Sequence, residues 1–447
     1  MSTPAAAKEP IPTYRIDLAR PPRLRYAEVV RDFGPRMKSL ASVVDVLLIS
    51  VIRSSWLRTI VKVLSRVCLH RVYDDEENEE IKGIAKESGV SLYLLIALNN
   101  VLDCLLGCTS GAVPVSLKKG SHKQGTAMAA GDDQPRLLHF RTLDWGMDEL
   151  RDLLVVLEYV NSESQNPDQV IARSITYAGF VGALTAVKKD LSLSLNFRPN
   201  HDHSSRSLRW HQLLVLLGKR RSIGSILRSV ILRHDEPSWG LEDPPGTKDG
   251  VELKEKENAD SHIERQARRM ASIRSAPCYL VLCTGLEAAI VEKDFETGKI
   301  RTSTSFLAQT NHDQEDEPDR LSPQTAGAVS AHRRDIISCS FDIEGWIEES
   351  ADRLKCIEEK WDRHSKKFQP GDASAVIKDG HVRSRVSRDK PKMPSTSPSI
   401  TEGTLRKWIT APPTTNECTH FATIMDPVTG EFRWMKRGPI EEEGSES

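Results

Sequence analysis

The chain has 447 residues, of which 38% are hydrophobic and 28% charged, and this composition is typical of a globular protein. Its 62 Lys and Arg residues balance 63 Asp and Glu residues, and the net charge of −1 argues against the overall electrostatic attraction expected of a nucleic-acid-binding protein. The length fits either about three ordinary domains or one large α/β unit.

Several features of the sequence bear on the cellular compartment in which the protein is expected. The first 20 residues lack the apolar segment that is typical of a secretory signal peptide. No Asn stands in an acceptor sequence for N-glycosylation. The longest apolar stretch, 43–52, is interrupted by Asp45 and is too short to span a bilayer. The 8 cysteines are scattered without a CxxC pair, a pattern typical of reduced thiols. We therefore expect a cytoplasmic protein, or a lysosomal or vacuolar one if the N-terminus is incomplete.

The N-terminal 107 residues follow a helical pattern after an extended, Pro-rich start. Residues 43–67 combine apolar stripes with Arg and Lys around Trp56, so this stretch either packs on the protein or makes a peripheral membrane contact. Residues 74–80 are expected to form an acidic loop. Ser91 is expected to cap a Leu-rich helix that continues to Gly107.

From Cys108 onward the sequence predicts strands. They are expected over 108–115, 137–145, 153–160, 172–180, 181–187, 190–197, 278–284, 288–293 and 302–311, with a C-terminal hairpin over 419–436. Helices are expected over 208–217, 223–232 and 342–360. Residues 235–260 are expected to be a loop insertion, and the Pro- and Ser-rich stretch 366–400 to be disordered.

Consecutive strands with helices grouped between them differ from the alternation of a doubly wound sheet. The pattern favours an α+β fold with antiparallel sheets covered by helices. Two parts are expected: a helical N-terminal segment, 1–107, and a catalytic domain, 108–447.

Five motifs in a fixed order carry the chemical information. The first is Cys108-Thr109-Ser110 at a helix-to-strand boundary, and the second is Arg141-Thr142-Leu143-Asp144-Trp145 on the next strand. They are followed by the run 175–200 with Asn196, the segment 306–313 with Asn311, and Arg333 shortly after it. The tail 419–435 and the opening 10–26 complete the pattern over about three quarters of the chain.

This series resembles the acid ceramidase and N-acylethanolamine acid amidase family of N-terminal nucleophile (Ntn) cysteine hydrolases, which act on linear amides. The resemblance implies an αββα sandwich and self-cleavage before the cysteine, here between Gly107 and Cys108. The two fragments would remain associated, and no cofactor or metal is expected. The substrate would be an N-acyl lipid: ceramide is our first choice, and an N-acylethanolamine or other fatty amide is the alternative.

The same resemblance suggests roles for six residues. Cys108 would be the nucleophile, and its freed α-amine, with an ordinary pKa of about 7.7 to 8.0, would serve as the base. Arg141 would lower the thiol pKa, and Asp144 would orient the amine. Asn311 and Asn196 would donate to the oxyanion, and Arg333 would close the site electrostatically.

Two departures from the family leave a further alternative open. The hairpin loop 116–136 is longer than in the animal enzymes, and Phe197 follows Asn196 where those enzymes carry a Glu. An inactive lipid-binding relative that keeps the fold is therefore a third interpretation. The pair His201 and His203 is expected to lie in a loop, and the basic tract 378–392 is expected to be solvated.

Overall fold

We describe a computed structural model of the 447-residue chain. The structure describes residues 10–42, 54–101, 107–117, 135–199, 205–232, 261–313, 343–368 and 398–440. The described residues do not include Arg333, the insertion 235–260, the pair His201 and His203, or the basic tract 378–392.

The larger sheet has eight strands in the order β1-β4-β5-β6-β7-β8-β9-β10. Every neighbouring pair is antiparallel except β1 and β4, which run parallel. The strands are β1 (Thr13–Asp17), β4 (Leu154–Val160), β5 (Ala172–Tyr177), β6 (Thr185–Lys188), β7 (Leu191–Phe197), β8 (Cys278–Cys283), β9 (Ala288–Lys293) and β10 (Gly298–Ser303).

The smaller sheet has five strands in the order β11-β2-β3-β12-β13, all antiparallel. They are β11 (Leu307–Gln309), β2 (Gly107–Val115), β3 (Arg136–Asp144), β12 (Thr419–Asp426) and β13 (Glu431–Arg437). Strand β2 is buried along its whole length, and β3 is buried from its second residue onward. A strand that is covered on both faces requires a layer on each side of its sheet.

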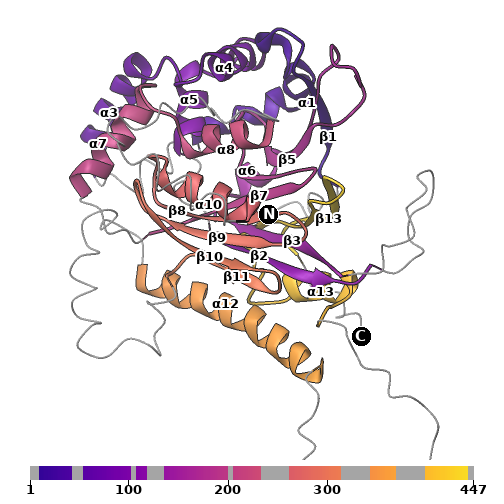
Figure 1. The fold of residues 1–447 in the computed structure, drawn as a ribbon. Coiled ribbons are helices and arrows are strands. Elements are labelled where there is room, and N and C mark those ends of the chain that lie inside the picture. Colours follow the sequence, from indigo (N-terminus) through magenta and orange to yellow (C-terminus); the bar gives the residue numbers. More distant parts are fainter. Residues whose placement is uncertain are drawn as a thin grey trace, which may run out of the picture.

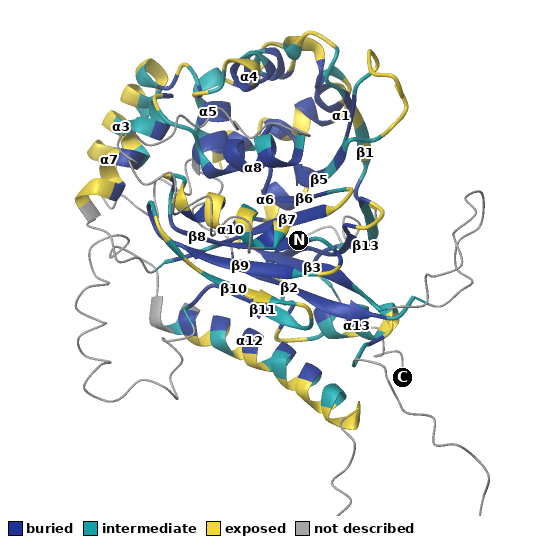
Figure 2. Cartoon of the chain, viewed as in Figure 1, coloured by how far each residue is buried: buried dark blue, intermediate teal, exposed yellow. Residues whose placement is uncertain are grey.

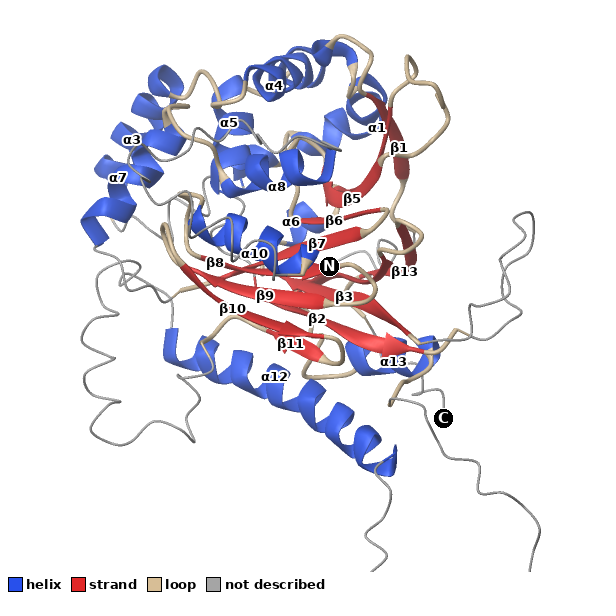
Figure 3. Cartoon of the chain, viewed as in Figure 1, coloured by secondary structure: helices blue, strands red, loops and turns tan. Residues whose placement is uncertain are grey.

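Helices cover the outer face of each sheet, so the molecule has the layers helix, sheet, sheet and helix (Figure 1, Figure 3). The outer face of the larger sheet carries α1 (Ala27–Met37), α3 (Ser55–Cys68), α4 (Asp75–Ser88), α5 (Leu92–Val101), α7 (Ser205–Leu216), α8 (Ile223–Leu232) and α10 (His262–Ser272). The outer face of the smaller sheet carries α12 (Ile343–Ser365) and α13 (Glu402–Thr410). The remaining short helices are η2 (Pro22–Leu24), α6 (Asp148–Arg151) and η6 (Lys366–Phe368). The predicted α+β sandwich is confirmed.

The core divides between the layers. The larger cluster fills the space between the two sheets and beneath the N-terminal helices, and Cys108 belongs to it. A second cluster joins α12 and α13 to the smaller sheet through Leu354, Ile357 and Leu405. Figure 2 shows the inner strands of the sheets buried and the outer side of α12 exposed.

Two expectations for the N-terminal segment need correction. The opening is not merely extended, because β1 forms an edge of the larger sheet against β4. The acidic stretch 74–80 is not a loop but the start of α4. Asp74 caps this helix by accepting from the main-chain N–H groups of Glu76 and Glu77, and acidic side chains are favourable in a first helical turn.

Some strand and disorder predictions also differ from the structure. The single strand expected over 302–311 is divided into the end of β10 and the separate β11, which belong to different sheets. Within the stretch expected to be disordered, 366–368 form η6, and Ile400 forms a bridge with Val115. The sequence does not predict helices α10 and α13, since short charged helices resemble loops in composition.

A buried charged group, here called the Glu80 cluster, joins the N-terminal segment to the rest. It consists of Arg25, Glu77, Glu80, Ser225 and Arg228. Glu80 accepts from Arg25 Nη1 at 2.9 Å and from Arg228 Nη2 at 2.7 Å, and Ser225 Oγ donates to Glu77 at 2.9 Å. The three side chains Arg25, Glu80 and Arg228 are nearly inaccessible to solvent. The cluster therefore links α4 to α8 across residue 107, where cleavage is expected.

Candidate active site

Cys108 is the second residue of β2, an inner strand of the smaller sheet that pairs with β3. Its register places it opposite Leu143, while Gly107 lies opposite Asp144. A Cβ at Gly107 would lie 3.2 Å from the Asp144 carbonyl oxygen, so the residue before Cys108 is tightly enclosed. The pairing thus brings the predicted nucleophile and the Arg-x-x-Asp motif together, as the sequence predicts.

Arg141 contacts the thiol directly. Its Nη2 donates to Cys108 Sγ at 3.2 Å, and its Nη1 donates to the Leu184 carbonyl oxygen at 2.6 Å. Burial raises the pKa of the Cys108 thiol, and the charge of Arg141 opposes this rise. Arg141 therefore acts in the predicted direction, but burial dominates and the net pKa is above the ordinary value.

Asn311 holds the main-chain nitrogen of Cys108. The Cys108 N–H donates to Asn311 Oδ1 at 2.7 Å, and Asn311 Nδ2 donates to the Phe197 carbonyl oxygen at 2.8 Å. The side-chain oxygen of Asn311, not its nitrogen, thus faces Cys108. The oxyanion-donor role that the resemblance suggests for Asn311 stays a prediction.

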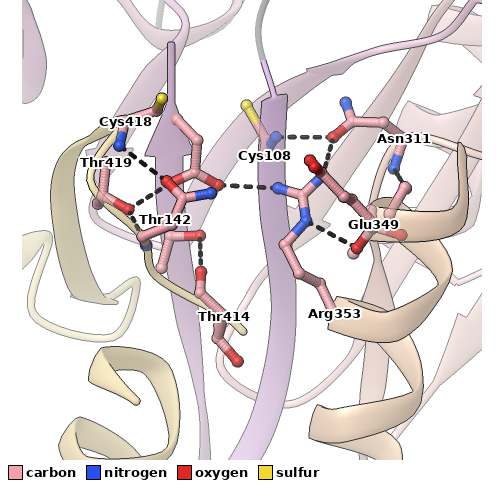
Figure 4. Close-up of polar contacts among 12 residues, drawn as sticks. Cys108, Thr142, Asn311, Glu349, Arg353, Thr414, Cys418 and Thr419 are labelled. Atoms are coloured by element: carbon pink, nitrogen blue, oxygen red, sulfur yellow. Dashed lines mark hydrogen bonds and ion pairs between the residues drawn. The ribbon is translucent and has the colours of Figure 1, made fainter. Parts of the chain in front are cut away.

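Asp144 is fixed from two sides. Its Oδ1 accepts from Thr419 Oγ1 at 2.6 Å, and its Oδ2 accepts from Arg353 Nη1 at 2.8 Å. Arg353 Nη2 also donates to Asn311 Oδ1 at 3.1 Å (Figure 4). Burial raises the pKa of Asp144, and Arg353 and the hydrogen bond from Thr419 oppose this rise. Arg353 therefore links the carboxylate to the amide that holds Cys108.

Sequence reasoning does not identify Arg353. This residue lies on α12, where the sequence predicts a charged helix, yet its side chain is only 6% exposed. It precedes Leu354 and Ile357 on the apolar face of the helix, and a charged residue beside an apolar stripe is the sequence feature that could have indicated it. The predicted Arg333 lies outside the described residues, so its role stays a prediction.

Asn196 lies next to the site without contacting the thiol. Its Oδ1 accepts from Ser110 Oγ at 2.7 Å, and its Nδ2 donates to the carbonyl oxygens of Gln309 and Thr310 at 3.0 and 3.2 Å. These contacts tie the end of β7 to β2 and to the residues before Asn311. The geometry indicates a supporting residue, and the oxyanion role of Asn196 stays a prediction.

The site therefore holds a thiol beside a guanidinium, the main-chain nitrogen of the same cysteine fixed by an amide, and a carboxylate held by a second guanidinium. A cysteine at the start of an inner strand, between two sheets that helices enclose, is the arrangement that the resemblance to N-terminal nucleophile hydrolases implies.

Comparisons with known proteins lead to the family. The model for the beta subunit of N-acylethanolamine-hydrolyzing acid amidase matches residues 9–73. Acid ceramidase from Heterocephalus glaber is 27% identical over 239 residues, covering 50% of this chain and 54% of that protein. Acid ceramidase from Pan troglodytes is 27% identical over 237 residues with the same coverage. The resemblance to the acid ceramidase and N-acylethanolamine acid amidase family is confirmed, and the chain spans about half the length of these relatives.

A solved structure is also similar in part. The Caenorhabditis elegans N-acylethanolamine-hydrolyzing acid amidase ortholog is 13% identical, with a TM-score of 0.41, and the match covers 74% of this chain and 100% of that one.

Proposed function

We propose that the chain is an amidohydrolase that cleaves the amide bond of N-acyl lipids with Cys108 as its nucleophile, after cutting itself between Gly107 and Cys108. The observation that carries the proposal is the pair of contacts on this one residue. Arg141 lies 3.2 Å from its sulfur, and Asn311 lies 2.7 Å from its nitrogen.

Self-cleavage needs both contacts. The Cys108 sulfur attacks the Gly107 carbonyl carbon and forms a thioester, and the peptide nitrogen leaves as an amine after gaining a proton. Asn311 fixes that nitrogen during the exchange, and Arg141 stabilises the developing thiolate. Water then hydrolyses the thioester, which leaves a carboxylate on Gly107 and a free thiol on Cys108.

Turnover repeats the same steps on a lipid amide. The α-amine of Cys108 takes the thiol proton and later gives it to the leaving amine, because its ordinary pKa lies near neutrality. Asn311 Oδ1 already accepts from this nitrogen, and Asp144 lies on the neighbouring strand, clamped by Arg353. The resulting acyl-enzyme is hydrolysed by water.

Ceramide is the first choice of substrate, supported by the acid ceramidase relatives, and an N-acylethanolamine is the alternative. Burial of a long acyl chain contributes about 0.8 kcal/mol of binding free energy for each CH₂ in either substrate. The two substrates therefore differ chiefly in the amine that leaves. The test is turnover of ceramide and N-palmitoylethanolamine side by side in detergent micelles at pH 4.5 and pH 7.5. Faster turnover of ceramide supports the first choice, and faster turnover of the ethanolamide overturns it. Turnover of neither substrate favours the inactive lipid-binding interpretation.

We also propose that α3 contacts a membrane surface. Its outer face exposes a continuous apolar stripe, with Trp56 63% exposed and Val67 73% exposed. The other exposed apolar residues of the stripe are Leu57, Ile60, Val63 and Leu64. In the part of the chain that the structure describes, no helix is long and apolar enough to cross a bilayer. A surface contact would bring the site to lipids that stay in the membrane.

Flotation with anionic phospholipid vesicles tests this contact. The double variant Trp56→Ser with Val67→Ser should lose most vesicle binding. The control is Leu286→Ser, because Leu286 is 77% exposed in the turn between β8 and β9. Equal binding by the double variant and the wild type would contradict the proposal.

A further inference from the structure

Helix α12 contacts Asn311 at two points one helical turn apart. Arg353 Nη2 donates to the side-chain oxygen of Asn311 at 3.1 Å, and the main-chain N–H of Asn311 donates to Ser350 Oγ at 2.8 Å. Ser350 and Asn311 are fully buried. The residue that holds the Cys108 nitrogen is therefore itself held by α12 at both its side chain and its main chain.

Ser350 is oriented in turn by His312. Ser350 Oγ accepts from Asn311, so its own hydrogen is available to His312 Nδ1, which lies 2.9 Å away. Burial lowers the pKa of His312 to about 4; Asp313 opposes this change, and Arg353 adds to it. The ring is therefore neutral at ordinary pH, and Nδ1 can accept. Thr310 Oγ1 lies 3.1 Å from the same nitrogen and is the other hydroxyl that faces it.

These contacts replace strand pairing that ends at Gln309. Strand β11 stops there, so the main chain at Asn311 has no neighbouring strand among the described residues to accept its N–H. A buried N–H without an acceptor costs about 1 to 3 kcal/mol, and Ser350 removes that cost. Gln309 Nε2 also donates to the His312 carbonyl oxygen at 2.7 Å, which closes the turn around Asn311.

We infer that Ser350, oriented by His312, is a positioning residue that sets the angle at which Asn311 holds the Cys108 nitrogen. The inference rests on the proposed function, and Ser350 does not touch the reacting atoms. The nitrogen at the cleaved bond of the uncleaved chain becomes the α-amine of the cleaved enzyme. The same contact between Ser350 and Asn311 would therefore position this nitrogen in both self-cleavage and lipid-amide hydrolysis.

The test compares Ser350→Ala with Ser350→Thr, which keeps the hydroxyl, and with Ser365→Ala. Ser365 lies at the far end of the same helix, where its hydroxyl donates to the Asp362 carbonyl oxygen at 3.2 Å. In Ser350→Ala, the rate of self-cleavage and the kcat for lipid amide should both fall about tenfold, with KM unchanged, as expected for loss of one aligning hydrogen bond. Ser350→Thr and Ser365→Ala should stay within about twofold of the wild type.

Hydrogen exchange provides a readout that does not depend on activity. In a Cys108→Ala background, which stays uncleaved, Ser350→Ala should make the Asn311 amide exchange about tenfold faster, whereas Ser365→Ala should not. The inference would be overturned if Ser350→Ala left the exchange rate of the Asn311 amide unchanged. It would also be overturned if the wild type were active and Ser350→Ala cleaved itself and turned over substrate at the wild-type rates. Faster exchange together with a wild type that neither cleaves nor turns over would instead overturn the proposed function and leave Ser350 as the residue that orders Asn311.

Discussion

The Cys108 site and the Glu80 cluster are both buried, both contain paired arginines and carboxylates, and yet they differ in what those charges face. In the Glu80 cluster, Arg25 and Arg228 are directed at the carboxylate of Glu80. In the site, Arg353 is likewise directed at the carboxylate of Asp144, but Arg141 is directed at the thiol of Cys108. The guanidinium that faces a thiol, and not buried charge as such, therefore distinguishes the site from the cluster.

The two regions also differ in their expected roles. The Glu80 cluster joins the parts before and after residue 107, and β1 adds main-chain pairing with β4 to the same connection. The site lies at residue 107 itself. Changes at the site should therefore affect chemistry, and changes in the cluster should affect the association of the two parts.

The largest effect is expected from Cys108→Ala, which removes the nucleophile. Self-cleavage and lipid-amide turnover should both be abolished, whereas Cys108→Ser should keep slow cleavage because a hydroxyl can attack the Gly107 carbonyl. A denaturing gel and a turnover assay measure the two activities. Cys68→Ala, on the outer helix α3, is the matched control and should behave as the wild type. Turnover by Cys108→Ala would end the proposed mechanism.

The next largest effect is expected from Asp144→Asn. The amide keeps the size of the side chain but removes the charge that pairs with Arg353, so kcat should fall at least about 100-fold while the chain stays folded. Asp148→Asn is the control, because the Asp148 side chain is 84% exposed in its pair with Arg151. Circular dichroism verifies folding, and full activity of a folded Asp144→Asn would show that this carboxylate has no role.

A change in the Glu80 cluster should produce the opposite pattern. In the uncleaved Cys108→Ala background, Glu80→Gln removes the carboxylate that pairs with the buried Arg228 and one of the two carboxylates that pair with Arg25. The free energy of unfolding should fall by about 3 to 5 kcal/mol. Denaturant titration measures the change, and Glu79→Gln, in the partly exposed pair with Lys82, should change the free energy of unfolding much less. In the cleavable chain, Glu80→Gln should leave the rate of chemistry per folded molecule unchanged, and a slower rate would couple the two regions.

The smallest effect concerns Glu77 and pH. Burial raises the pKa of Glu77 to about 7 from an ordinary 4.5, with Asp74 and Glu80 raising it and Arg228 and Ser225 lowering it. The folded state therefore holds a proton that the unfolded state releases, so stability falls as pH rises from about 4.5 to above 7, by up to about 3 kcal/mol. In the Cys108→Ala background, Glu77→Gln should remove this slope in urea titrations. An identical slope in both proteins would contradict the assignment.

The layered fold and the motif residues are predictable from the sequence because their patterns are local. Alternating apolar residues indicate strands, and Cys108, Arg141 and Asp144 follow at a spacing that a hairpin brings together. The acidic start of α4 is harder to predict, since helix caps and loops share Asp and Glu.

Other parts of the site depend on contacts between residues that are far apart in the sequence, which local sequence patterns do not predict. Arg353 reaches Asp144 across 209 residues, and Thr419 reaches it across 275. The side-chain orientation of Asn311 is set by Arg353 and Phe197, which lie on different elements, so its role could not be fixed from its position in the sequence.

The most direct test of the central claim is the intact mass of the purified chain under denaturing conditions, with sequencing of the larger fragment. We predict two fragments, residues 1–107 and 108–447, the larger beginning Cys-Thr-Ser, and one uncut chain for Cys108→Ala. A chain that remains whole while it hydrolyses an N-acyl lipid would contradict the claim that the α-amine of Cys108 is part of the catalytic machinery.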